Sequence, residues 1–275
     1  MAQIPVIITG YFPQPEDQPP LCAPLKPYDG RKLDLRDVTL VVTETLLHDL
    51  AREAVLECLR FADYGEVAIF SDRPIDVPNA TWHSLVHVEG DPDTCARFMW
   101  SANFLDRIGT KFFQLLHWDS WIVDPAMWRS DFLDYDFIAA PWWYRDGYNV
   151  GCGAFAIHSV RLWRHLVDNP ERFPFPPRQA DDVLGRTYRK QIEPEGFTWA
   201  PDDLALSFAF ECSRSTVGRS RHFGFHEFRN WPLVLERDRL IDRVKLAMRS
   251  EYIRRSGKLD QMWHGAPWLR RYVET

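Results

Sequence analysis

Apolar residues recur along this chain with two different spacings, which predict strands that alternate with helices. Short runs rich in apolar residues at 38–43, 67–70 and 112–116 are typical of strands buried in a parallel sheet. Between the first two runs, residues 47–61 carry apolar side chains at the three- and four-residue spacing of a helix. The order strand, helix, strand predicts a βαβ unit with a right-handed crossover, and therefore an α/β fold with a mostly parallel central sheet flanked by helices.

The same spacings predict the remaining elements of the fold. Gly65 is expected to end the first helix, and Ser159 is expected to cap a later helix that runs to residue 167. In chain order we expect a strand at 82–88, a helix at 91–108, strands at 137–140 and 151–157, helices at 181–190 and 201–210, and a strand or loop at 221–228.

The two ends of the chain differ from its middle. Residues 1–36 contain six prolines between positions 13 and 27, too many for a helix or a central strand, and are expected to form an extended arm. Residues 37–230 form the expected main domain. The tail, residues 231–275, has ten Lys and Arg against six Asp and Glu and fits an amphipathic helix. We expect this tail to pack on the domain, with peripheral docking on an anionic membrane as the alternative.

Composition narrows the class of protein. The net charge of −6 argues against a general nucleic-acid binder, although the basic tail leaves a nucleic-acid acceptor open. The five cysteines are scattered, which indicates a reducing compartment rather than a disulfide frame or a zinc cage. Since no run of eighteen apolar residues occurs, a cytoplasmic protein without a transmembrane segment is expected. The chain has twelve tryptophans, whose rings either fill the core or offer flat surfaces on which sugars or bases stack. The candidates for such binding surfaces are Trp118, Trp121, Trp142 and Trp143.

Polar residues that interrupt the apolar pattern are the candidate functional groups. Asp119 follows the strand at 112–116, and ligands of open α/β sheets bind at the carboxyl ends of strands. It is placed to hold a divalent cation or a ligand hydroxyl, or else to cap a turn. His226 ends an apolar stretch and either bonds a backbone carbonyl or joins Asp119 as a metal ligand.

Two further motifs carry candidate chemistry. Gly151 and Gly153 let the backbone approach a ligand closely, or simply lead into a strand. Asp181 and Asp182 open a predicted helix, where the helix dipole favours carboxylates. Either carboxylate is also placed to act as a general base that takes a proton from an acceptor hydroxyl.

Taken together, these motifs resemble a bacterial domain-of-unknown-function family of GT-A-like glycosyltransferases, within the nucleotide-diphospho-sugar transferase superfamily. The resemblance spans residues 33–228 and rests on seven segments in order: LDLRDVTLVVTET, ARFMWS, LLHWDSWIVDPAMW, FLDYDFIAAPWW, NVGCGAFAIHSVRLW, ADDVLGRTYR and FGFHEF. It implies a GT-A-like fold, transfer of a sugar from a nucleoside diphosphate sugar (with a UDP-sugar as the expected donor) to an acceptor hydroxyl, and a role in polysaccharide or glycoconjugate biosynthesis.

The resemblance also implies roles for individual residues. Asp119 and His226 become ligands of Mn²⁺ or Mg²⁺, and Asp182 or Asp181 becomes the general base. Gly151 and Gly153 fall in the loop beside the donor sugar or the acceptor. The positions near the nucleotide are Thr43, Glu44 and Asp72 at strand ends, Arg97 toward the diphosphate, and Trp118 as an aromatic wall.

The chain departs from the family pattern at three places. Cys152 and Ala154 replace the second and fourth residues of an expected Gly-Asn-Gly-Gly loop, Asp181 replaces a glutamate, and His117 stands where many GT-A enzymes have an aspartate.

The sequence is also compatible with two other functions. A non-catalytic carbohydrate or nucleotide binder would use the same aromatic walls, and a nucleotidyltransferase would share the sheet and the metal.

Overall fold

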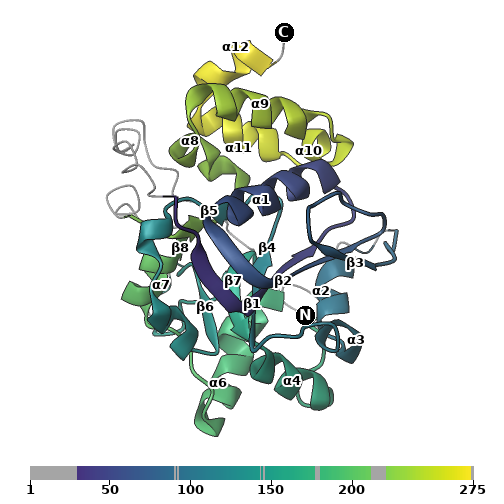
Figure 1. Cartoon of the computed structure of the whole chain (residues 1–275), viewed down its shortest axis with the longest axis vertical. Coiled ribbons are helices and arrows are strands. Elements are labelled where there is room, and N and C mark those ends of the chain that lie inside the picture. The colour runs from purple at the N-terminus through teal and green to yellow at the C-terminus, as the bar shows by residue number, and fades with distance from the viewer. Residues whose placement is uncertain are drawn as a thin grey trace, which may run out of the picture.

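A six-stranded sheet forms the centre of the molecule in a computed structural model, which describes residues 30–89, 91, 93–142, 144, 146–176, 180–211 and 221–273. Helices cover the sheet on both sides (Figure 1). Its strand order is β3-β2-β1-β4-β7-β6, with β1 at Leu33–Thr43, β2 at Ala62–Ser71, β3 at Thr81–Ser84, β4 at Phe112–Leu116, β6 at Phe137–Ala139 and β7 at Phe155–Ser159. The predicted α/β class with a large, helix-flanked central sheet is confirmed.

Strand direction fixes where a ligand fits this sheet. β1 runs parallel to both β2 and β4, and β2 runs parallel to β3. β7 runs antiparallel to its two neighbours, β4 and β6. Because the chain proceeds from β1 toward β2 and β3 and then returns to the other side of β1, the strand order reverses between β1 and β4. Ligands of open α/β sheets bind at the carboxyl ends of the strands at such a switch point.

The first βαβ unit forms for the reasons that its sequence indicates. The apolar residues of β1 from Leu40 to Val42 are at most 1% exposed, as expected for a strand covered on both faces. α1 (His48–Phe61) buries the stripe formed by Leu50, Ala51, Ala54, Val55 and Cys58 against the core.

Several predicted boundaries were wrong, each for a local reason. The first helix ends at Phe61, and Gly65 lies inside β2, where an added Cβ would come within 2.2 Å of the Arg36 carbonyl oxygen. β3 stops at Ser84, and Val86 beyond it is 76% exposed. The helix expected at 91–108 is two short ones, α2 (Thr94–Met99) and α3 (Ala102–Leu105), because Ser101 caps a new start by accepting from Phe104 N.

Later boundaries also shifted. β7 begins at Phe155 rather than at Gly151, whereas Ser159 caps α4 (Val160–Asp168) as expected. The helix predicted at 181–190 consists of α5 (Ala180–Asp182), a π-helical segment η4 (Val183–Tyr188) and α6 (Arg189–Ile192). The helix predicted at 201–210 is α7 (Asp202–Phe208), followed by a two-residue strand.

A second, three-stranded sheet joins segments that are far apart in the chain. Its order is β5-β9-β8, with β5 at Trp121–Ile122, β8 at Ala209–Phe210 and β9 at Gly224–Phe225. β9 runs antiparallel to β5 and parallel to β8, so that Trp121, Phe225 and Phe210 lie in one row across the sheet. The residue before β5 and the residues after β9 and β8 therefore meet at the same end of this sheet.

Gly224 lets this small sheet lie against the core. A Cβ at this position would meet the ring of Phe155, a fully buried residue of β7, at 2.1 Å. We expect Gly224→Ala to lower the free energy of unfolding by about 1–3 kcal/mol, because neither ring nor strand has room to move. Chemical denaturation measures this. Gly265→Ala is the matched control, since nothing lies within 4 Å of its added Cβ, and it should change stability by less than about 0.5 kcal/mol.

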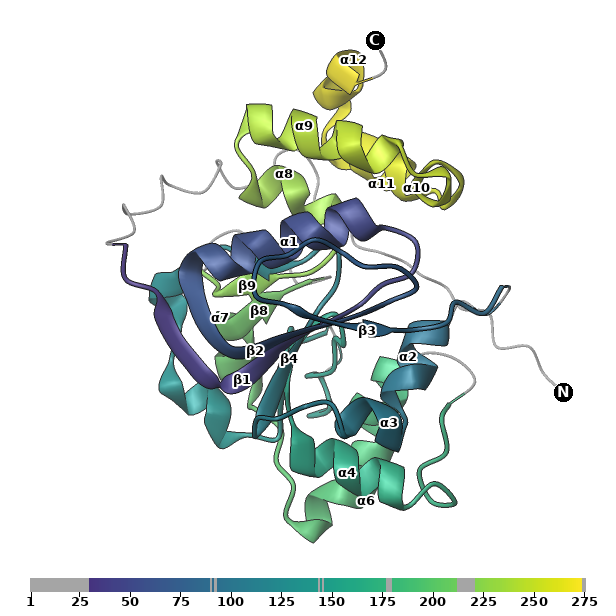
Figure 2. The ribbon, with the colours of Figure 1, turned by 45° about the vertical axis from the view of Figure 1, so that its right-hand side comes forward.

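The C-terminal helices stack over α1 (Figure 2). They are α8 (Trp231–Val234), α9 (Arg237–Met248), α10 (Glu251–Arg255), α11 (Lys258–Gly265) and α12 (Arg270–Val273). The single amphipathic helix expected here is thus broken after Met248. α9 buries Leu240, Val244 and Ala247. At the other end of the chain, β1 begins inside the arm predicted for residues 1–36, and the rest of that arm lies outside the described residues.

A buried ion pair ties the tail to α1. The carboxylate of Glu57 contacts the guanidinium groups of Arg239 and Arg243, and the Glu57 and Arg243 side chains are 9% and 7% exposed. Glu57→Ala is expected to lower the free energy of unfolding by about 3–5 kcal/mol, because it leaves the Arg243 charge buried without its main partner. Glu251→Ala, which breaks an exposed pair with Arg255, should change the denaturation midpoint little. Equal effects of the two substitutions would show that the buried pair does not hold the tail.

Candidate metal and catalytic site

The candidate site begins at the carboxyl end of β4, beside the switch point. A tight turn follows the strand: His117 N donates to Ala154 O at 3.0 Å, and Ser120 Oγ donates to the same carbonyl at 3.0 Å. The turn therefore fixes Asp119 between β4 and β5. The Asp119 side chain is only 2% exposed, so a bound ligand or another side chain of the protein has to compensate its charge.

His226 faces Asp119 because of the small sheet. It follows β9 directly, and its Nε2 lies 3.3 Å from Asp119 Oδ1. The other carboxylate oxygen, Oδ2, accepts from Phe228 N at 3.1 Å. Oδ1 receives no hydrogen bond of acceptable geometry from any of the described residues. An acceptor oxygen that is buried without a hydrogen bond is what a bound cation would satisfy.

His117 completes the first group of three. Its ring meets that of His226 edge-to-face at 5.7 Å between centroids. Potential ligand atoms of His117, Asp119 and His226 all lie within 4.8 Å of one another. Two imidazole nitrogens and a carboxylate are ligands that Mn²⁺ accepts, and the residues therefore fit a divalent cation.

The protonation states of His117 and Asp119 suit such a site, whereas that of His226 does not. Burial, with repulsion from His226, lowers the pKa of His117 to about 4, so its imidazole is neutral near pH 7. Burial alone would raise the pKa of Asp119, but the attraction of His226 outweighs it and lowers that pKa to about 2. Burial lowers the pKa of His226, but the charge of Asp119 outweighs burial and holds that pKa well above its ordinary value, so His226 has to lose a proton before it binds a cation.

A second group of three occupies the other side of the His226 ring. Nδ1 lies 2.7 Å from Glu211 Oε1 and 3.4 Å from Cys152 Sγ. Glu211 follows β8 directly, and its Oε2 accepts from Trp142 Nε1 at 3.2 Å. Asn230 Nδ2 donates to the backbone carbonyls of both Glu211 and His226. The ligand atoms of Cys152, Glu211 and His226 also lie within 4.8 Å of one another.

The glycine loop packs beneath the start of α5. A Cβ on Gly151 would lie 2.3 Å from the Trp142 ring, and one on Gly153 would lie 3.2 Å from Asp181 Cβ. A Cβ on Gly185 would in turn come within 2.9 Å of Gly151 Cα, so the loop and the π-helical segment approach backbone to backbone. This contact places Asp181 above the glycine loop, on the side of Glu211 and His226.

Asp181 and Asp182 interact with different neighbours. Partial desolvation and the repulsion of Glu211 raise the pKa of Asp181, although its side chain reaches solvent. Asp182 instead lies 3.6 Å from Arg186 Nε, and Arg186 also pairs with Asp146 at 2.8 Å. Of the two carboxylates, Asp181 is therefore the one whose charge interacts with Glu211 and His226.

Of the residues expected near a nucleotide, those at the strand ends already have partners. The Glu44 carboxylate accepts from Leu46 N at 2.7 Å and from Leu47 N at 3.0 Å, and burial raises its pKa. Thr43, at the end of β1, is 6% exposed. Asp72 lies 2.6 Å from His48 Nε2 at the end of β2.

The other two residues expected near the nucleotide, Arg97 and Trp118, differ in their contacts. Arg97 pairs with Asp91 at 3.1 Å and lies over the Phe175 ring. Trp118 is 7% exposed and packs on Phe228 and Trp231, so its ring offers little surface to a ligand. Trp121 and Trp142 are buried as well, and Trp143 lies outside the described residues.

Sequence reasoning did not assign three members of the two groups, His117, Glu211 and Cys152, as functional residues, and it noted His117 only as a departure from a family pattern. Glu211 follows a two-residue strand that carries no periodic signal, and only the pairing of β8 with β9 brings it to His226. Cys152 stands inside the glycine motif, where it was noted only as a departure from a family pattern.

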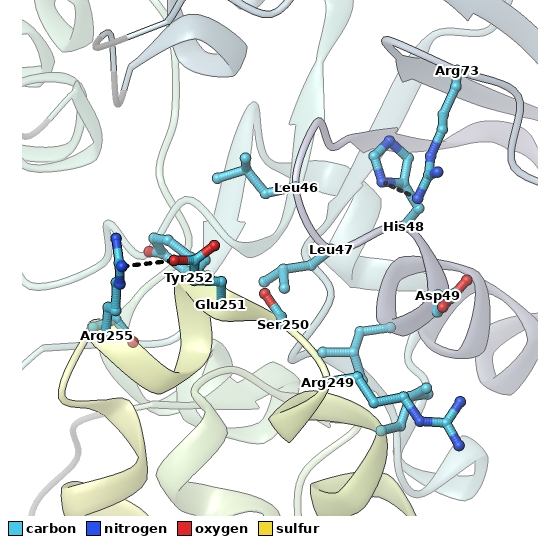
Figure 3. Close-up of a pocket in the computed structure, with 13 residues that line it drawn as sticks. Leu46, Leu47, His48, Asp49, Arg73, Arg249, Ser250, Glu251, Tyr252 and Arg255 are labelled. Carbon is cyan, nitrogen blue, oxygen red and sulfur yellow. Dashed lines mark hydrogen bonds and ion pairs between the residues drawn. The ribbon is translucent and has the colours of Figure 1, made fainter.

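A separate cleft of about 730 Å³ opens between the start of α1 and the turn from α9 to α10 (Figure 3). Arg73 reaches the His48 ring at 3.3 Å on one side of it, and Arg255 pairs with Glu251 at 2.8 Å on the other. Exposed Leu46 and Tyr252 also line it. None of the candidate cation ligands lines this cleft, so it is separate from the candidate site.

None of the helices in the described ranges combines the length and apolar content needed to cross a bilayer. A family model described as "Protein of unknown function (DUF5672)" matches residues 87–226. Among curated protein sequences, none matches the chain.

Of three solved structures similar to this chain, one is described as a glycosyltransferase and one as a mannosyltransferase. One, involved in glycosylation of the major capsid of PBCV-1, is 10% identical with a TM-score of 0.43, covering 69% of this chain and 92% of that one. A mutant of LgtC is 12% identical with a TM-score of 0.45, covering 82% and 99%. A mannosyltransferase from Pyrobaculum calidifontis, in complex with GDP-Man and Mn²⁺, is 14% identical with a TM-score of 0.37, covering 90% and 76%. At these values, the chemistry of the site rests on its own side chains.

Proposed function

Since the chain belongs to the family described as Protein of unknown function (DUF5672), its activity has to be inferred from its side chains, and we propose that it transfers a sugar from a nucleoside diphosphate sugar to an acceptor hydroxyl. One observation carries the proposal. Three side chains whose atoms could together hold a cation lie at the carboxyl end of β4, beside a glycine loop and a carboxylate of raised pKa.

The cation ligands suit a diphosphate leaving group. We propose that His117, Asp119 and His226 Nε2 hold Mn²⁺ or Mg²⁺, with Mn²⁺ favoured by the two imidazoles. Such a cation, when bound, stabilises the negative charge that develops on the departing diphosphate. Near pH 7 His117 is neutral and Asp119 is ionised, so both side chains have lone pairs for a cation, whereas His226 gives up a proton when the cation binds.

The acceptor needs a base, and Asp181 is the carboxylate that we propose for it. A carboxylate whose pKa is raised toward the operating pH takes a proton more readily than an ordinary one. Asp181 reaches solvent, so an acceptor hydroxyl can approach it, and it lies beside Gly153. Asp182 is proposed to hold Arg186 in place rather than to react.

The remaining contacts of the donor follow from the strand ends. We propose that Gly151 and Gly153 let backbone groups approach the transferred sugar, since neither carries a side chain that would block it. The ends of β1 and β2, with Thr43, Glu44 and Asp72, border the nucleoside, and Arg97 is the cation proposed for the diphosphate. A UDP-sugar is the donor we would try first, with a glycan or another small hydroxyl compound as the acceptor.

The direct test measures release of nucleoside diphosphate from a panel of UDP- and GDP-sugars, with Mn²⁺, with Mg²⁺ and with a chelator. We expect slow hydrolysis of at least one donor that Mn²⁺ stimulates and the chelator stops. A nucleotide that binds only the folded protein also raises its melting temperature, which identifies the base of the donor. Binding without any turnover would indicate a non-catalytic binder, and pyrophosphate release from nucleoside triphosphates would indicate a nucleotidyltransferase. Either result contradicts the proposal.

A further inference from the structure

The second group of three, around His226 Nδ1, has a chemistry different from the first. Cys152 is 1% exposed, and a buried cysteine ordinarily behaves as a small apolar side chain among other apolar groups. Here the thiol lies against an imidazole nitrogen at 3.4 Å, in a group that also includes the Glu211 carboxylate. A thiol is only a weak hydrogen-bond donor, and His226 Nδ1 and Glu211 Oε1 already pair with each other at 2.7 Å, so a protonated Cys152 adds little to their contact.

We propose that Cys152, Glu211 and His226 Nδ1 form a second cation site, selective for Zn²⁺, and that it competes with the site of His117 and Asp119 for the single imidazole of His226. A thiolate is a soft ligand that favours Zn²⁺ over Mg²⁺ and Mn²⁺. Binding releases the thiol proton to solvent, and three protein ligands leave the fourth position of a tetrahedral zinc open.

The distances suit zinc. Bond lengths of about 2.3 Å to sulfur and about 2.0 Å to nitrogen place these two atoms about 3.5 Å apart around a tetrahedral ion. Cys152 Sγ and His226 Nδ1 are 3.4 Å apart. Zinc bonds of about 2.0 Å to nitrogen and oxygen place those two atoms about 3.3 Å apart, so the Glu211 oxygen, now 2.7 Å from Nδ1, has to move outward by about 0.6 Å, which a rotation of its side chain allows.

The ligands are also held from behind. Trp142 Nε1 orients the Glu211 carboxylate, and Asn230 fixes the backbone of Glu211 and of His226. Groups that orient ligands in this way are typical of metal sites. The two sites exclude each other because a neutral imidazole has one lone pair: His226 binds a cation through Nδ1 or through Nε2, and its other nitrogen keeps the proton.

Cobalt spectroscopy tests the site whether or not the protein is a transferase. Co²⁺ bound to a thiolate gives a sulfur-to-metal charge-transfer band in the near ultraviolet, which oxygen and nitrogen ligands do not give. We expect this band on adding Co²⁺ to the full chain, its loss in Cys152→Ser, and its retention in Cys95→Ser. Absence of the band, or its survival in Cys152→Ser, would overturn the proposal.

A second variant guards against misfolding of Cys152→Ser. Glu211→Gln keeps the thiol, so the band should persist at saturating Co²⁺ while Zn²⁺ binds more weakly. Loss of a partner behind a ligand costs about 10- to 100-fold in affinity, and loss of a ligand should cost at least as much. An unchanged zinc affinity in Glu211→Gln would remove Glu211 from the site.

Competition between the sites is read from Mn²⁺ by electron paramagnetic resonance, because free Mn²⁺ has a sharp six-line spectrum that weakens on binding. One equivalent of Zn²⁺ should release Mn²⁺ from the unaltered protein and release at least tenfold less from Cys152→Ser. Equal release from both proteins would mean that Zn²⁺ enters the His117 and Asp119 site instead. If Zn²⁺ and Co²⁺ bind as expected but no donor is hydrolysed, the zinc site stands and the proposed transferase function fails.

Discussion

Asp119→Asn is expected to abolish the stimulation of donor hydrolysis by Mn²⁺ or Mg²⁺, lowering the stimulated rate at least about 100-fold. The reason is that the Asp119 carboxylate is buried and ionised. One of its oxygens, Oδ1, accepts no hydrogen bond from the described residues and is therefore the atom proposed to bind the cation. Release of nucleoside diphosphate, measured over a series of Mn²⁺ concentrations, gives both the rate and the apparent metal affinity.

The matched control for this substitution is Asp131→Asn. It neutralises a carboxylate that lies later in the chain, at the surface, where Asp131 forms an ion pair with Arg129. Its rate and metal affinity should equal those of the unaltered protein. Full Mn²⁺ stimulation in Asp119→Asn, with circular dichroism showing a folded protein, would exclude Asp119 as a ligand.

Asp181→Asn is expected to lower transfer to the acceptor by about 10²- to 10⁴-fold, the usual contribution of a general base. Its raised pKa and its place above the glycine loop distinguish it from its neighbour. The Michaelis constant for the donor should change little, because Asp181 is proposed to act on the acceptor rather than to bind the nucleotide.

Asp182→Asn serves as the paired comparison. Arg186 keeps Asp146 as a partner when Asp182 is neutralised, so the rate should stay within a few-fold of the original. The reverse pattern, with Asp182→Asn slow and Asp181→Asn fast, would show that the side chain paired with Arg186 is the base. Two fast variants would mean that neither carboxylate is.

Local periodicity was enough to predict the three central strands β2, β1 and β4, because each contains a buried apolar run that is typical of a parallel sheet. It could not separate neighbouring carboxylates, since Asp181 and Asp182 have the same chemistry and only the turn of the helix over Gly151 and Gly153 directs one toward the cluster. It also could not find Glu211, whose position depends on strand pairing between residues distant in the chain. The tryptophans proposed as ligand walls turned out to be core residues where they are described, since the same large ring serves both purposes.

The three-stranded sheet has a consequence for how the protein matures. His117 and Asp119 leave the ribosome about a hundred residues before His226, and domains acquire their long-range contacts only when the later partner is available. A nascent chain therefore carries an incomplete set of ligands through most of its synthesis. The proposed cation site is therefore complete only once β9 has paired with β5, and on this proposal metal binding would mark the completion of folding rather than its beginning.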